Sequence, residues 1–176
     1  MKSIIKKEEY EEIYRMLDEV SPVDFDCGTI CGALCCQDIE GYEMGMYLLP
    51  GEEKVHDRHD SWMIWSKEKA EDFEFPDSWK GALYFLKCAD PANCKREKRP
   101  IQCRSFPLLP AINENGELSL VFDDTPLPYS CPLIESKTEL NKDFIEVTKK
   151  AWEKLIKDPL IYDYVKEESD KRRIIS

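Results

Sequence analysis

The sequence of 176 residues lacks any long hydrophobic run. No stretch approaches the roughly 20 consecutive apolar residues that a membrane-spanning helix requires, so we expect no membrane partner. The first twenty residues carry charge from Lys2 onward and contain no uninterrupted apolar segment, which argues against a secretory signal. We therefore expect a cytoplasmic protein.

The chain also lacks a surplus of basic residues. It has 36 Asp and Glu against 25 Lys and Arg, which gives a net charge of -11. Nucleic acids and anionic membranes attract basic surfaces, so this balance argues against a general affinity for either. The sequence has no glycine-rich cofactor loop either, which argues against a dinucleotide-binding enzyme.

Cysteine, in contrast, is abundant, with eight residues in the chain. In a reducing cytoplasm such clustering marks metal binding or redox chemistry more often than a disulfide framework. With 42% hydrophobic residues, the chain is long enough to bury a core without disulfides, and it suits one domain over residues 1–176. Free cysteine is also common in cores, but eight unrelated core thiols would be an unusual coincidence.

The hydrophobic pattern predicts helices at both ends of the chain. The first covers roughly the first twenty residues, with Ser3 as its cap and Ser21-Pro22 as its end. Near the C-terminus, one helix is expected from Lys142 to about Asp158 and a second over residues 161–171.

Short aromatic runs between these helices predict strands. The expected strands cover residues 44–50, 62–66, 82–88, 109–112 and 118–122, and the last two pair across a turn at residues 113–116. We predict an α+β fold with one small antiparallel sheet. Seven of the eleven prolines fall between Pro91 and Pro132, so we expect an irregular, Cys- and Pro-rich metal-binding centre.

The first cysteine group consists of Cys27, Cys31, Cys35 and Cys36, punctuated by glycines. If the segment is one helix, the spacing of four places Cys27, Cys31 and Cys35 on one face and turns Cys36 away by about 100°. If it is a loop, the glycines let backbone amides approach the sulfurs. Either geometry permits metal ligation.

The second group consists of Cys88, Cys94, Cys103 and Cys131, with 5, 8 and 27 intervening residues. Paired ligands of zinc fingers and ribbons usually lie two to four residues apart, so these cysteines predict a site assembled from distant segments. Zinc or a four-iron cluster needs about four thiolates, which leaves one site with spare cysteines or two sites.

Basic residues surround two of these cysteines, although the chain as a whole is acidic. They are Lys95, Arg96, Lys98, Arg99 and Arg104. Cations near thiolates offset their negative charge and lower the pKa of thiols, which favours ligation. A solvated loop, or a docking patch for an anionic substrate, would explain the same residues.

The two histidines, His56 and His59, are three residues apart and are weaker candidates for metal ligands. This step would place both imidazoles on one face of a helix. Their sequence context is highly charged, however, and predicts an exposed loop.

Three segments together resemble the putative zinc- or iron-chelating cysteine-cluster family, also called YkgJ-like. They are CGTICGALCC, KCADPANCKREKRPIQCRSFPLLP and the later Cys131-Pro132. In the second segment, six positions match the family pattern, namely Arg99, Pro100, Cys103, Arg104, Phe106 and Pro107. The first group departs from the usual C-x-x-C-x-x-C-C pattern, because each of its first two intervals contains one additional residue.

The resemblance implies a metal-binding protein. We expect Cys31, Cys35, Cys36, Cys103 and Cys131 to supply most ligands, with Cys27, Cys88 and Cys94 completing or flanking the site. Arg99 and Arg104 would stand behind the ligands as compensating cations. The metal would be zinc, with a structural role, or an iron-sulfur cluster, with electron transfer or substrate activation.

Two alternatives remain from the sequence. One relative of the family, flagellin lysine N-methylase, is an enzyme, which implies that a peptide or protein side chain is a conceivable substrate. The vicinal Cys35-Cys36 pair is also compatible with a thiol redox sensor, although no C-x-x-C motif lies beside a βαβ pattern.

Overall fold

The helices at the two ends of the chain pack against each other in the computed structural model, which describes residues 2–25, 27–93 and 95–175. Helix α1 covers Lys7–Asp18, α5 covers Lys142–Leu155 and α6 covers Pro159–Ile175. Their apolar faces share one core, whose fully buried residues include Tyr10, Leu17, Trp152 and Ile161. This packing confirms the predicted terminal helices.

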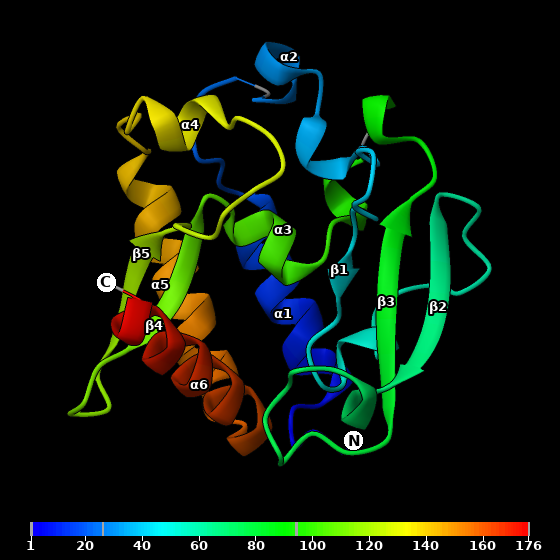
Figure 1. Ribbon diagram of the computed structural model, residues 1–176, viewed down its shortest axis with the longest axis vertical. Coiled ribbons are helices and arrows are strands. Elements are labelled where there is room, and N and C mark those ends of the chain that lie inside the picture. Colours follow the sequence, from blue (N-terminus) through cyan, green and yellow to red (C-terminus); the bar gives the residue numbers. More distant parts are fainter. Residues whose placement is uncertain (1, 26, 94, 176) are drawn as a thin grey trace.

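The strands form two separate antiparallel sheets rather than the single sheet predicted. The larger sheet has the order β1-β3-β2, with β1 at Met46–Tyr47, β2 at Met63–Lys69 and β3 at Ala82–Cys88. The smaller is the hairpin of β4 (Leu108–Ile112) and β5 (Leu118–Phe122). In Figure 1, α1 lies between the hairpin with its helices and the larger sheet. The fold class is therefore α+β, as predicted.

Short helical turns connect these elements. The short α-helices are α2 (Gly28–Cys31), α3 (Ile101–Ser105) and α4 (Pro132–Glu135). The 3-10 turns are η1 (Leu34–Cys36), η2 (Glu52–Lys54), η3 (Ala70–Asp72), η4 (Pro91–Asn93) and η5 (Arg96–Lys98). Proline precedes α3 and begins α4, where its fixed φ suits the first helical turn. Among the described residues, no helix has the length and apolar character to cross a membrane.

The predicted cap of the first helix is wrong. Ser3 Oγ donates a hydrogen bond to Asp158 Oδ2 at 2.6 Å, and the backbone N–H of Ile4 donates to the same oxygen at 2.7 Å. Because buried Asp158 holds this segment, α1 begins later, at Lys7, and Glu9 accepts from the backbone N–H of Lys6. The N-terminal segment is thus fastened to the start of α6.

Replacing Gly45 by alanine is expected to lower the free energy of unfolding by about 1–3 kcal/mol. A Cβ atom at residue 45 would lie 2.2 Å from Cζ of Phe85 and 2.8 Å from the carbonyl oxygen of Leu86. Chemical denaturation checks the result. The double variant Gly45→Ala/Phe85→Leu should recover part of the loss, and an unchanged midpoint in the single variant would contradict this packing.

Candidate metal centre

The first cysteine group does not form one helix. Helix α2 ends at Cys31, because Gly32 and Ala33 both adopt left-handed backbone conformations, with φ of 65° and 58°. The 3-10 turn η1 then carries Cys35 and Cys36, whose Sγ atoms lie 3.7 Å apart. The prediction of one face over two turns, with Cys36 turned away, is therefore wrong, and the alternative of a loop with a short helix describes the segment better.

Cys131 lies beside this group although it is distant in sequence. It is the residue before α4, and its carbonyl oxygen accepts hydrogen bonds from the N–H groups of Ile134 and Glu135. Its side chain is buried in a small apolar cluster against which Cys27 packs. Burial raises the pKa of the Cys131 thiol, and the nearby thiols of Cys31 and Cys35 raise it further.

Tyr129 lies near the same cysteines. Burial is the main cause that raises the pKa of Tyr129, and the thiols of Cys35, Cys131 and Cys36 raise it further. These three cysteines therefore share one neighbour. Figure 1 shows α2, which precedes η1 in the chain, and α4, which follows Cys131, at one end of the molecule.

The other predicted ligands belong to other elements or fall outside the described residues. Cys88 ends β3, where it pairs in register with Met63 of β2. Cys103 lies in α3, close to Tyr14 of α1. Cys94 is outside the described residues. Over residues 2–25, 27–93 and 95–175, no three His, Cys, Asp or Glu side chains are arranged as a ready metal site, and no disulfide joins the seven described cysteines to one another.

Two of the basic residues, Arg96 and Arg104, contact the C-terminal end of α1, whereas Lys95 lies over the Trp62 ring and Lys98 forms an ion pair with Asp60. Arg96 donates hydrogen bonds from Nη2 to the carbonyl oxygens of Leu17 and Val20, the first at 3.0 Å. Burial lowers the pKa of Arg96, as do the neighbouring charges of Arg99 and Arg104, whereas Asp18 and Cys27 oppose this shift. Positive charge is therefore concentrated next to Cys27.

Arg104 is completely buried, in contrast to most arginines. Its Nε donates to the carbonyl oxygen of Arg99 at 2.6 Å, its Nη1 forms an ion pair with Asp18, and its guanidinium lies 4.4 Å from the centre of the Tyr14 ring. Its Nη2 is buried and has no hydrogen-bond partner within the part of the chain that the structure describes. The charge of Arg104 is thus held rigidly one residue from Cys103.

A buried polar network beneath these arginines escaped the sequence analysis. The hydroxyl oxygen of Tyr14 lies 2.6 Å from Oε1 of Glu52 and 2.8 Å from Nε2 of His56. Glu52 is fully buried and also accepts from the backbone N–H groups of Leu49 and Ile101, at 2.9 and 2.8 Å. Glutamates usually face solvent, so nothing in the sequence marks Glu52 as internal.

His56 is packed into this network, and the expected exposed loop is wrong for it. Its ring meets those of Tyr14 and Trp65 edge to face, at 5.6 and 6.0 Å between centres. Burial, Arg104 and Lys98 lower the pKa of His56 to about 4. The exposed His59 takes no part in these contacts, so the two imidazoles do not form a pair.

Stability should fall as the pH is lowered from about 6.5 to about 4. Since folded His56 has the lower pKa, the unfolded chain binds more protons in this range, and a shift from 6.5 to about 4 corresponds to about 3 kcal/mol. Tyr14, Glu52, Arg104 and Lys98 face the ring from four other elements.

Denaturation midpoints of the wild type and His56→Gln across this pH range provide the measurement. The raised pKa of Glu52 acts in the opposite direction, but it is present in both proteins, so their difference isolates His56. The stability of the wild type relative to His56→Gln should fall as the pH is lowered through this range. A constant difference between pH 7 and 4 would contradict a buried, neutral imidazole.

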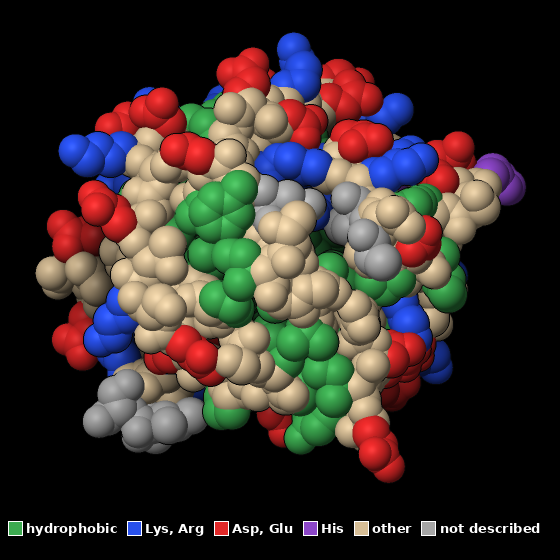
Figure 2. Space-filling model, turned by 90° about the horizontal axis from the view of Figure 1, so that it is seen from above, with side chains coloured by type: hydrophobic (Ala, Val, Ile, Leu, Met, Phe, Trp, Pro, Cys, Tyr) green, Lys and Arg blue, Asp and Glu red, His purple; other side chains and the backbone are tan. Residues whose placement is uncertain are grey.

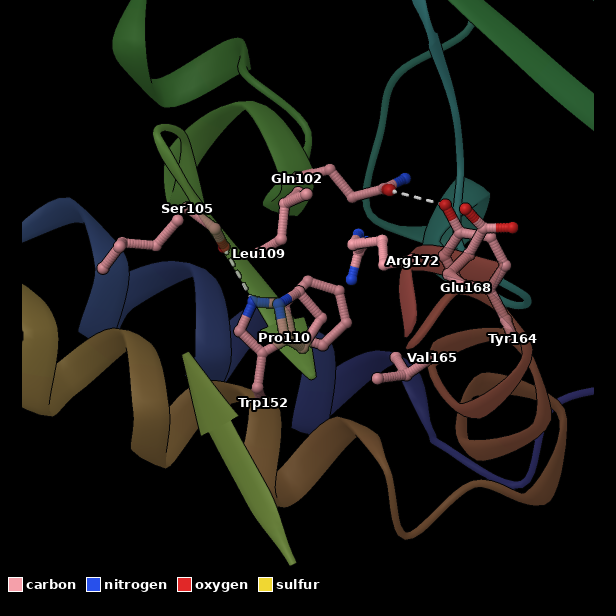
Figure 3. A pocket seen from close by; sticks show the side chains of 10 residues that line it. Gln102, Ser105, Leu109, Pro110, Trp152, Tyr164, Val165, Glu168 and Arg172 are labelled. Atoms are coloured by element: carbon pink, nitrogen blue, oxygen red, sulfur yellow. Dashed lines mark hydrogen bonds between the residues drawn. The ribbon is translucent and has the colours of Figure 1, made fainter. Parts of the chain in front are cut away.

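A small cavity lies between α3, β4, α5 and α6. Figure 3 shows its polar lining, in which Tyr164 faces Gln102 at 3.4 Å and Trp152 Nε1 donates to Ser105 Oγ at 3.0 Å. Its volume of about 20 Å³ suits a single water molecule. It is too small for a substrate.

Comparisons with known proteins found no matching family model, no matching curated protein and no matching solved structure. The resemblance to the cysteine-cluster family therefore stays a prediction from the sequence motifs.

Proposed function

We propose that the protein binds zinc through the thiolates of Cys35, Cys36, Cys31 and Cys131. The separation of 3.7 Å between the sulfurs of Cys35 and Cys36 carries the proposal. With Zn–S bonds of about 2.3 Å, two thiolates of a tetrahedral zinc lie about 3.8 Å apart. The vicinal pair therefore already has the spacing of one tetrahedral edge.

The surroundings of the pair support two further ligands. The thiols of Cys31 and Cys35 both act on the pKa of Cys131, so Cys131, from a distant segment, lies close to both of them. Full convergence of four sulfurs requires small movements of these segments, since no three ligands are already arranged together among the described residues. Gly32, between α2 and η1, allows such movement because glycine restricts the backbone least.

The local charges also support a thiolate site. Four thiolates around one zinc ion leave two excess negative charges, which nearby cations offset. Arg96 lies close enough to Cys27 for the two charges to interact, and Arg99 and Arg104 lie beside Arg96. The zinc would have a structural role, because it would join the α2–η1 segment to the start of α4 and add its binding energy to folding.

Zinc fits the vicinal pair better than an iron-sulfur cluster does. In a four-iron cluster each iron takes one cysteine, and the thiolates point outward from separate corners. Two sulfurs in near contact, as in Cys35 and Cys36, suit two ligands of one ion instead.

Titration of the metal-free protein with cobalt(II) under anaerobic conditions tests this proposal. Cobalt in a tetrahedral thiolate site gives strong visible bands and intense sulfur-to-metal charge-transfer absorption, and stoichiometric zinc should remove both. Cys88→Ser, at the end of the larger sheet, should give the wild-type spectrum. A weak octahedral spectrum, or none, in the folded wild type would exclude the four-thiolate site.

A further inference from the structure

The vicinal pair has a geometry that adjacent residues seldom provide. In an extended chain, neighbouring side chains point to opposite faces, which separates their sulfurs. Here the left-handed residue Ala33 leads into the 3-10 turn η1, and both sulfurs lie on one side, 3.7 Å apart. Cys35 and Cys36 therefore present two thiols to one ligand without any change in the backbone.

The pair is also accessible. Cys35 is exposed and Cys36 is half-buried, whereas Cys131 beside them is only 8% exposed. Figure 2 looks down on this end of the molecule, where hydrophobic side chains, a class that includes cysteine, gather beside Lys and Arg. A reagent can thus reach Cys35 from solvent, and the buried thiol of Cys131 lies close to it.

From this geometry we propose that Cys35 and Cys36 form a surface dithiol that captures trivalent arsenic compounds. Thiolates select soft ions, and trivalent arsenic takes two or three sulfurs in a pyramid, so it needs fewer ligands than tetrahedral zinc. The proposal rests on the thiol site of the proposed function but not on the binding of zinc there.

The reaction is a condensation without any change of oxidation state. An organic arsenic oxide, R–As=O, reacts with two thiols, two S–H bonds break, two As–S bonds form, and both protons leave with the oxygen as water. Inorganic arsenite exchanges three hydroxyl groups in the same way, and Cys131, close to Cys35, supplies the third thiolate.

Phenylarsine oxide is the probe, added to the reduced full-length protein. Mass spectrometry should show one phenylarsenic group per chain, retained against excess monothiol and released by a small dithiol. Removal of either sulfur converts a two-point attachment into a one-point attachment, which should weaken retention by about 10²–10⁴-fold. Cys35→Ser and Cys36→Ser should both show this loss, and Cys88→Ser should not.

Cys35 is exposed, so its substitution leaves the core intact, and near-UV circular dichroism verifies the fold of each variant. Retention of the arsenical by either serine variant at the wild-type level, or its absence in the reduced wild type, overturns the dithiol. Zinc content is measured separately on the same samples. Capture by a protein that binds no zinc overturns the proposed function alone, and zinc binding without capture overturns the dithiol alone.

Discussion

Glu52→Ala is expected to lower the free energy of unfolding by about 3–5 kcal/mol. The fully buried carboxylate accepts hydrogen bonds from Leu49 N–H, Ile101 N–H and the Tyr14 hydroxyl, which join η2, α3 and α1. Each buried donor left without an acceptor costs about 1–3 kcal/mol. Since whole domains are stable by only about 5–15 kcal/mol, this single change removes a large part of the total.

Denaturant titrations of the wild type, Glu52→Ala and Glu53→Ala measure the effect. Glu53 is the next residue of the same turn but is only partly buried, and within the described part of the chain its carboxylate accepts no such bonds, so its substitution should change stability by no more than about 0.5 kcal/mol. Equal midpoints for the two alanine variants would show that Glu52 does not hold these elements together.

Cys36→Ser should weaken zinc binding by about 100-fold or more. A structural zinc site contributes roughly 10–16 kcal/mol, so each of four thiolates accounts for about 3 kcal/mol, which corresponds to about two powers of ten in affinity. Competition with a chromophoric chelator at fixed pH measures the change. The thermal midpoint of the zinc-treated variant should also fall toward that of the metal-free protein, because ligand binding stabilises only the folded state.

Cys88→Ser is the matched control for this substitution. Cys88 lies in β3, opposite Met63, and its replacement should leave zinc affinity within a few-fold of the wild type. Similar losses in Cys36→Ser and Cys88→Ser would remove the distinction between the vicinal pair and the remaining cysteines, and with it the proposed set of ligands.

The larger elements could be predicted because local pattern and tertiary environment agree. The hairpin is the clearest case, since the turn after Ile112 is fixed by Asn113, whose side-chain oxygen accepts from the N–H groups of Asn115 and Glu117. The division into two sheets could not be predicted, because α1 and α3 separate the strands and no local pattern encodes that separation. Ser3 failed as a cap for the same reason, since its partner, Asp158, is 155 residues away.

The candidate site was predictable in composition but not in geometry. The cysteine pattern identified the first group and Cys131 as candidates, and the fold brings them near one another, but metal binding by them stays a prediction. A helix and a loop were equally compatible with the pattern of the first group. The left-handed conformation of Ala33 decides between them, and alanine seldom adopts it. The internal network of Glu52 and His56 left no sequence signal, because charged neighbours suggest an exposed segment.

The most direct test of the central claim is the metal content of the wild-type protein after anaerobic purification. Zinc, iron and sulfide are measured per chain, and the visible spectrum is recorded on the same sample. We expect one zinc per chain in a colourless protein. Brown protein with iron and sulfide, or folded protein that neither retains nor takes up zinc, would contradict it.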